Sequence, residues 1–150
     1  MATQTFALFF GGTTGTAFND FQGSGVGTSC SGISSIQFYW DSNTLRGVTV
    51  SYQVGGVVSH GSTSSSDLET KIISLADNEE ITEVVVYAGN FLSGRVGGVT
   101  ISTSLGQSVP FGNTTNGLQT TLTIPTGAAV QALCGQSGAD LDALGFVVTQ

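Results

Sequence analysis

Positive charge is nearly absent from this sequence. Among its 150 residues only Arg46, Lys71 and Arg95 are basic, against ten acidic side chains, and the formal net charge is −7. A protein that binds nucleic acid needs a basic surface to neutralise phosphates, and electrostatic binding to an anionic membrane needs one as well. The composition therefore excludes nucleic acid as a partner, and we expect no direct lipid binding.

Long hydrophobic runs are missing too. Mean hydropathy is positive, yet no apolar stretch approaches the roughly 20 residues that a membrane-spanning helix requires. The N-terminal stretch MATQTFALFF has neither the basic region nor the long apolar region of a signal peptide. We therefore expect a cytoplasmic or non-classically secreted protein, unless the chain is a mature form to which a Met was added.

Cysteine is scarce, and the chain has a single histidine. Cys30 and Cys134 lie about 100 residues apart, without metal-type spacing near either. Two partly buried free thiols are the favoured interpretation, and one disulfide is the alternative in an oxidising compartment. No group of Asp, Glu or His has the spacing of calcium or zinc ligands. We expect neither a metal nor a cofactor.

What the sequence does contain is glycine, serine and threonine between short β-branched and aromatic runs. Turn signals recur every 8–12 residues or so, which is typical of a sandwich or a barrel-like β domain. No segment predicts a helix, and the ambiguous stretch 67–75 is better interpreted as a strand. Val54-Gly55-Gly56-Val57 predicts a hairpin with a two-residue turn. Nothing divides the chain, so we expect one all-β domain over residues 1–150, with strand-like runs at 3–10, 32–40, 45–54, 56–60, 81–88, 95–103, 117–124, 128–134 and 141–149.

Alternation within the run 45–54 indicates an antiparallel sheet with one buried face. Val48, Val50 and Tyr52 fall on one side of the strand, and Thr49, Ser51 and Gln53 fall on the other. The polar side consists of Thr, Ser and Gln in place of Lys and Glu. That choice explains the low content of charge.

The segment Gly135-Gln-Ser-Gly-Ala-Asp-Leu-Asp-Ala-Leu-Gly145 resembles the C-terminal signature of the jacalin-related lectins. The glycine-rich stretch 10–18 resembles the opening loop of that family, and the stretches 33–36 and 48–52 resemble its second and third strands. His60-Gly61 and Val109-Pro-Phe-Gly112 stand where the family often has His-Gly and Gly-Pro-Phe-Gly. The resemblance implies a β-prism I fold, in which three four-stranded Greek-key sheets surround a pseudo-threefold axis. The strand pattern alone would suit a sandwich equally well.

The resemblance also implies a carbohydrate site centred on Asp142. Its carboxylate would accept hydrogen bonds from two sugar hydroxyls, commonly those on carbons 4 and 6. The amides of Ala139 and Asp140, in the turn after Gly138, would donate to the ring oxygen and the 6-hydroxyl, and the amide of Gly15 to the 3- or 4-hydroxyl. A carboxylate between two glycine-rich loops suits vicinal hydroxyls, because glycine lets the backbone approach a ligand closely.

The loop Ser93-Gly94-Arg95 stands where members of the family vary in specificity. Arg95 is therefore a further candidate for contact with the ligand.

Each candidate also has a purely structural interpretation. Asp142 could cap a turn, and Gly15 could be only a turn glycine. We expect the Asp140 side chain to face solvent, which leaves only its amide for a ligand. His60 is expected to make a structural hydrogen bond, and Trp40 is expected to pack at the core or an edge more readily than to stack on a sugar.

Departures from the family pattern narrow the expected function. Two-site members carry a second Gly/Asp loop after the second strand, but Arg46 stands where that Asp would fall, so we expect one site per chain. The residues between Gly138 and Asp142 are not aromatic, and the chain is continuous where galactose-preferring members are cleaved. Both points favour a metal-independent mannose/glucose lectin over a galactose-binding one.

Three further expectations concern partners and activity. Glycans and glycoproteins containing mannose or glucose would be the partners, and a homodimer or homotetramer would supply several linked sites. The alternative is a recognition module that keeps the fold without binding sugar. An enzyme is not expected: a glycosidase needs two placed carboxylates, and around the only close pair, Asp140 and Asp142, no neighbour is suited to raising one pKa.

Overall fold

The computed structural model describes residues 5–12, 14–23, 29–88, 95–115 and 118–150. In these residues the chain forms strands and no helix, so none is present that could cross a membrane. The all-β prediction is confirmed. The strands are β1 (Thr5–Gly11), β2 (Thr16–Asn19), β3 (Ser31–Trp40), β4 (Leu45–Val54), β5 (Val57–Gly61), β6 (Glu69–Ser74), β7 (Ile81–Ala88), β8 (Val96–Thr103), β9 (Ser108–Gly112), β10 (Gln119–Thr123), β11 (Ala129–Ser137) and β12 (Leu141–Thr149).

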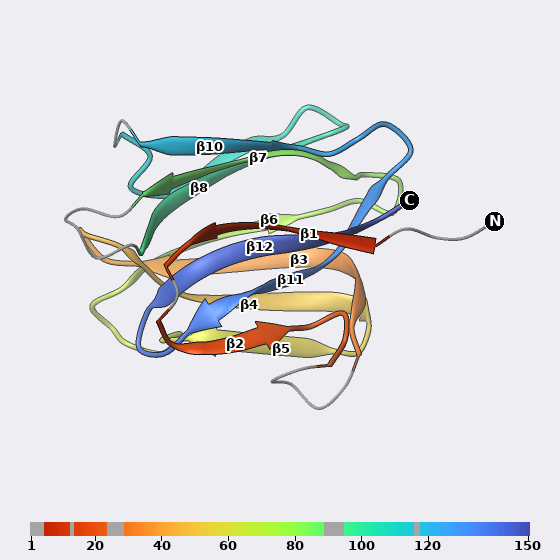
Figure 1. Ribbon diagram of the computed structural model, residues 1–150. Coiled ribbons are helices and arrows are strands. Elements are labelled where there is room, and N and C mark those ends of the chain that lie inside the picture. Colours follow the sequence, from red (N-terminus) through yellow and green to blue (C-terminus); the bar gives the residue numbers. More distant parts are fainter. Residues whose placement is uncertain (1–4, 13, 24–28, 89–94, 116–117) are drawn as a thin grey trace.

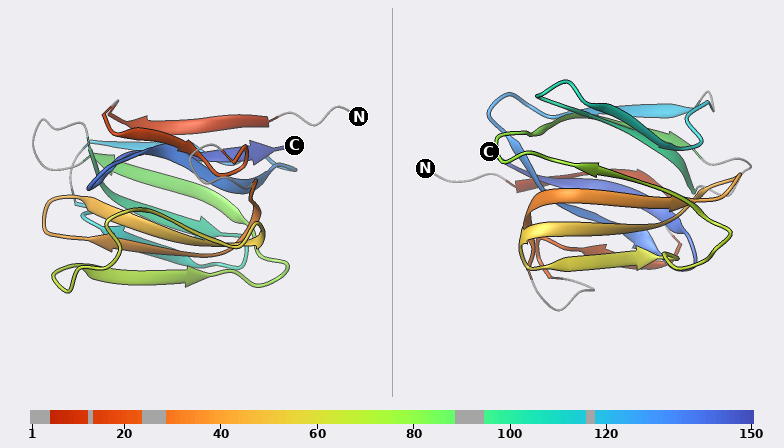
Figure 2. Two further views of the ribbon diagram at one scale, coloured as in Figure 1. Left: turned by 90° about the horizontal axis from the view of Figure 1, so that it is seen from below. Right: turned by 180° about the vertical axis from the view of Figure 1, so that it is seen from behind.

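The strands pair into three antiparallel sheets of four (Figure 1). Their orders are β1-β12-β11-β2, β5-β4-β3-β6 and β9-β8-β7-β10, so each sheet has a central hairpin flanked by two outer strands. The further views in Figure 2 show the three sheets facing one another around a common interior. This is the expected β-prism, and the alternative of a two-sheet sandwich is wrong.

The inner faces fill that interior with apolar side chains. In β4 the predicted alternation holds, because Val48, Val50 and Tyr52 are buried while Gln53 is exposed. Phe38 of β3 packs against Phe111 of β9, with ring centroids 4.8 Å apart, and thereby joins two sheets. The largest fully buried side chains include Phe38, Phe111, Phe146, Ile36, Leu45, Ile73, Ile101, Leu133, Leu141 and Leu144.

The pseudo-threefold relation extends to individual backbone contacts. In each sheet an outer strand ends with a glycine, and the next amide donates to the carbonyl of the second residue of the neighbouring inner strand. A Cβ on any of these glycines would lie 2.3–2.6 Å from that carbonyl oxygen, so only glycine fits. The three contacts are Gly12 N to Asp142 O at 2.8 Å, Ser62 N to Arg46 O at 2.8 Å, and Asn113 N to Gly97 O at 3.0 Å. Asp142, Arg46 and Gly97 are therefore equivalent positions.

Three local predictions are confirmed. The strands β4 and β5 are joined through Gly55-Gly56, and the ambiguous stretch 67–75 forms β6. Cys30 and Cys134 are buried free thiols, and burial raises the pKa of Cys134 to about 11.

Among the described residues every buried side-chain nitrogen and oxygen has a hydrogen-bond partner, which is the usual condition for a stable interior.

Candidate functional site

Loops from different sheets meet at the end of the prism opposite the C-terminus, at the left in Figure 1. The β11–β12 turn carries Gly138, Ala139 and Asp140, and Asp142 follows as the second residue of β12. Gly15 lies in the loop between β1 and β2, and Arg95 directly precedes β8. The predicted residues are thus brought together; Ser93 and Gly94 lie outside the described residues.

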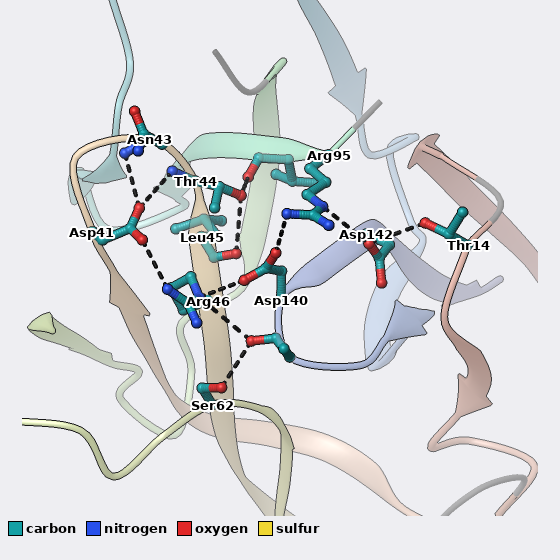
Figure 3. A network of polar contacts seen from close by, with 12 residues as sticks. Thr14, Asp41, Asn43, Thr44, Leu45, Arg46, Ser62, Arg95, Asp140 and Asp142 are labelled. Carbon is teal, nitrogen blue, oxygen red and sulfur yellow. Dashed lines mark hydrogen bonds and ion pairs between the residues drawn. The ribbon is translucent and has the colours of Figure 1, made fainter. Parts of the chain in front are cut away.

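Asp142 is 5% exposed and points toward the opening loop. Its Oδ1 accepts a hydrogen bond of 3.1 Å from the hydroxyl of Thr14, and Nε of Arg95 lies 3.5 Å from the same oxygen (Figure 3). Both partners come from other strands' loops, and no hydrogen bond to its own turn is recorded among the described residues. The carboxylate therefore joins distant loops and does not cap a local turn.

Gly15 packs directly on the Asp142 carboxylate. It has a positive φ of 86°, and a Cβ at this position would lie 2.5 Å from Oδ2 of Asp142 and 3.0 Å from the Ser137 carbonyl. Backbone of this kind is open to glycine and costly for other residues. Gly15 thus fixes how closely the opening loop approaches Asp142, in addition to forming a turn.

The expectation that Asp140 faces solvent is wrong. Asp140 is 7% exposed, and its two carboxylate oxygens form ion pairs with Nε of Arg46 and Nη1 of Arg95. Two guanidinium groups, from β4 and from the residue before β8, compensate its buried charge. Buried carboxylates are stable only with such partners.

Two of the three basic residues in the chain therefore lie at this one place. Arg95 is 45% exposed and belongs to the third sheet, while Arg46 is 31% exposed and belongs to the second. Together with Asp41, Asp140 and Asp142 they form a continuous row of alternating charges (Figure 3). The row has three carboxylates and two guanidinium groups, so it does not attract anions.

Asp41 is the last carboxylate of this row and forms an ion pair with Arg46. Burial favours a raised pKa for Asp41, but hydrogen bonds from the Asn43 amide, the Arg46 guanidinium and the Thr44 amide together lower it. The hydrogen bond to Asp41 likewise raises the pKa of Arg46. Both groups are therefore charged at neutral pH.

Backbone amides of the same loops are available as donors. The amide of Gly138 closes the turn by donating to the Asp140 carbonyl at 3.0 Å. In the part of the chain that the structure describes, the amides of Gly15, Ala139 and Asp140 have no recorded acceptor. These are the three amides that the sequence motifs predict as donors to a ligand.

His60 and Trp40 have the structural roles expected of them. The imidazole of His60 stacks on Phe18, and its Nε2 lies 2.8 Å from Oδ1 of the fully buried Asp20. Trp40 is half-buried against the core, lies edge-on to Phe111, and donates its indole N–H to Glu69 at 2.7 Å. Neither residue contacts the cluster around Asp142 in the described contacts.

Sequence reasoning missed four residues that support the site: Thr14, Asp41, Arg46 and Ser62. Only Arg46 has a sequence signal, since it stands where the family pattern would place a second Asp. Ser62 and Arg46 both donate to the carbonyl of Ala139, at 2.8 and 3.4 Å. These contacts join positions more than 75 residues apart, which a short motif does not reveal.

The arrangement combines a rigid carboxylate acceptor with several amide and guanidinium donors. This chemistry suits a neutral ligand with adjacent hydroxyl groups, because each hydroxyl both donates and accepts hydrogen bonds. Among the described residues no group of three or more His, Cys, Asp or Glu side chains is arranged to hold a metal ion.

Comparison with known proteins identifies the family. The model of the jacalin-like lectin domain matches residues 8–147, nearly the whole chain. The chain belongs to the jacalin-like lectin family. Members of this family have a carbohydrate-binding lectin fold, and the resemblance inferred from the motifs is confirmed. No curated protein sequence matches this jacalin-like chain.

Solved structures show the same fold for this jacalin-like lectin domain. A mannose-binding lectin from champedak aligns with a TM-score of 0.78 at 23% identity, over 99% of each chain. A mannose-specific jacalin-related lectin from Morus nigra, in complex with mannose, aligns at 0.79 and 23%, over 98% of this chain and 96% of that one. A lamprey immune protein aligns at 0.77 and 22%, and the present chain spans 45% of its length.

Proposed function

We propose that this protein is a non-enzymatic lectin that binds mannose or glucose at one metal-independent site per chain. The observation that carries the proposal is the Asp142 carboxylate, held between Gly15 and Arg95 beside the amides of Ala139 and Asp140. In this site Asp142 accepts hydrogen bonds from two adjacent sugar hydroxyls, and the amides of Gly15, Ala139 and Asp140 donate to sugar oxygens. Such charge-assisted bonds are the stronger kind.

Arg95 is the proposed specificity contact. Its Nε lies 3.5 Å from Asp142, farther than the 2.7–2.9 Å or so of a strong charge-assisted hydrogen bond, so a sugar hydroxyl can compete for that oxygen. The tighter pairing of Arg95 with Asp140 keeps the guanidinium beside the ligand. From there its remaining N–H groups can donate to a sugar oxygen.

The pseudo-threefold relation supports a single site of this type. Of the three equivalent positions only Asp142 has a carboxylate, while the others are Arg46 and Gly97. Mannose or glucose is favoured over galactose because Ala139 and Asp140 offer no aromatic surface for stacking. The champedak and Morus nigra proteins described as mannose-binding are consistent with this choice.

One such site gives weak binding, about millimolar or ~4 kcal/mol. We therefore propose a homodimer or homotetramer, in which linked sites raise the avidity for glycans that display several terminal sugars.

Isothermal titration with methyl α-mannoside and methyl α-galactoside tests the proposal. Wild type is expected to bind the mannoside, and Asp142→Asn is expected to lose detectable binding while its thermal unfolding stays close to wild type. Asp67→Asn is the matched control, because it removes an exposed carboxylate outside the contacts of the site. Equal binding by Asp142→Asn would disprove the site. Binding of the galactoside alone would contradict the proposed preference for mannose or glucose. An absence of binding on a broad glycan array would favour a recognition module that does not bind sugar.

A further inference from the structure

Arg46 stands at the position equivalent to Asp142 in the second sheet, yet its side chain is directed at the first sheet. Its Nη1 is 2.9 Å from Oδ2 of Asp41, and its Nε pairs with Oδ1 of Asp140 and lies 3.4 Å from the Ala139 carbonyl. The guanidinium thus contacts Ala139 and Asp140, two of the three residues whose amides are proposed as ligand donors. It does not contact Asp142 or the opening loop in the described contacts.

We infer that Arg46 is a positioning residue for the sugar site, which holds the β11–β12 turn in its ligand-binding shape. The inference rests on the proposed function and assigns to Arg46, and to Asp41 behind it, a role in affinity without contact to the ligand. The position in the second sheet that is equivalent to Asp142 here supports the site in the first sheet.

The geometry favours this role over that of an ordinary surface ion pair. Exposed pairs contribute little, because two long side chains lose conformational entropy to meet in water. Arg46 is different, since Asp41 is itself fixed by the amides of Asn43 and Thr44, at 2.8 and 3.0 Å. The guanidinium is therefore oriented before it meets Asp140, and a planar fork of donors loses little freedom per bond formed.

Arg46 supports two residues of the turn. Among the described residues, Ser62 and Arg46 are the donors to the Ala139 carbonyl. Asp140 is nearly buried, so its charge needs both arginines. Without Arg46, Arg95 would be the remaining ion-pair partner of Asp140 among the described residues. The amides of Ala139 and Asp140 would then have to become ordered when the ligand binds. Ordering at the moment of binding weakens affinity.

The test is a double-mutant cycle measured by titration with methyl α-mannoside. Arg46→Met removes the guanidinium at similar length, and Asp41→Asn removes its support without touching the turn. Each is expected to weaken binding about three- to tenfold. The double variant is expected to be no weaker than Arg46→Met alone, because Asp41 acts through Arg46. Arg46→Lys should restore only part of the affinity, since an ammonium cannot reproduce the fork.

A matched control separates positioning from net charge. Lys71→Met removes the third basic residue of the chain, on the exposed face of β6, and should leave affinity unchanged. Amide hydrogen exchange supplies a readout that needs no ligand: residues 138–142 should exchange faster in Arg46→Met, while strands of the third sheet exchange as in wild type.

The outcomes distinguish the two proposals. Unchanged affinity in Arg46→Met, or fully additive losses in the double variant, would overturn the positioning role and leave the lectin function intact. If wild type binds no sugar, the proposed function fails. Hydrogen exchange then decides the positioning role by itself, and unchanged exchange at 138–142 would refute it.

Discussion

Gly15 and Asp142 are in such close contact that a single added carbon would separate them. A Cβ on Gly15 would lie 2.5 Å from Oδ2 of Asp142, closer than any ordinary contact. The opening loop and the proposed sugar-binding carboxylate therefore fit together only if residue 15 has no side chain. In the proposed function, the site depends on this contact as directly as on the charge of Asp142.

The first prediction follows from that contact. Gly15→Ala should displace the Asp142 carboxylate and weaken mannoside binding at least about tenfold, which corresponds to 1.4 kcal/mol. Gly56→Ala is a matched control, because Gly56 has the same φ of 86° but nothing within 4 Å of a Cβ. It should cost similar backbone strain and leave affinity unchanged. Equal affinity losses in both variants, measured by titration, would show that strain matters and the contact does not.

The second prediction concerns the buried polar cluster of Asp20, Tyr52 and the Leu133 amide. The hydroxyl of Tyr52 donates to Oδ2 of Asp20 at 2.6 Å and accepts from the Leu133 amide at 3.0 Å, and all three groups are buried. Tyr52→Phe leaves an acceptor and a donor without that partner, at a cost of about 1–3 kcal/mol for each. Chemical denaturation should therefore show that the free energy of unfolding falls by roughly 2–6 kcal/mol.

Tyr39→Phe is the control for this prediction, because Tyr39 lies on the outer side of β3 and is only partly buried. It should change the free energy of unfolding by less than about 0.5 kcal/mol. If Tyr52→Phe lowered the free energy of unfolding by as little as Tyr39→Phe, the hydrogen bonds assigned to Tyr52 would be contradicted.

The third prediction concerns stability in acid. Hydrogen bonds from the Thr103 hydroxyl, the Ala76 amide and the Gln107 side chain lower the pKa of Glu79 below its ordinary 4.5. A carboxyl group whose pKa is lowered by folding stabilises the fold above its unfolded pKa, and this contribution is lost as pH falls through the lower folded value. Stability should therefore decline below about pH 4.5, with Glu79 as one contributor.

Glu79→Gln removes that titration. The variant should be less stable than wild type at pH 7, and the difference should shrink as the pH falls below 4.5. Thermal unfolding at several pH values measures it. A difference that is constant across the acid range would contradict the role of Glu79.

Most strands could be predicted from the sequence, because their apolar residues alternate and glycine marks their ends. The exceptions are β2 and β9, both short outer strands outside the predicted runs. In β9, Pro110 lacks an amide donor, which is tolerated only at an edge, and a proline weakens the strand signal of so short a run. The distinction between prism and sandwich came from motifs, since both architectures use the same alternation.

The site was predictable where a motif is local and unpredictable where a contact is long-range. Asp142 and its turn lie in one continuous segment, and Gly15 lies in the glycine-rich opening loop. The burial of Asp140 was missed because it depends on Arg46 and Arg95, 94 and 45 positions away in the chain. A buried carboxylate cannot be recognised until its cationic partners are known.

The three strand-end glycines, Gly11, Gly61 and Gly112, have a consequence for the side chains beside them. At each position a Cβ would clash with a backbone oxygen of the adjacent strand, so glycine is required independently of any ligand. Because only backbone atoms of the adjacent strand take part, the contact is the same whether that strand carries Asp142, Arg46 or Gly97. One repeated backbone contact thus accommodates three different side chains at the same end of the prism.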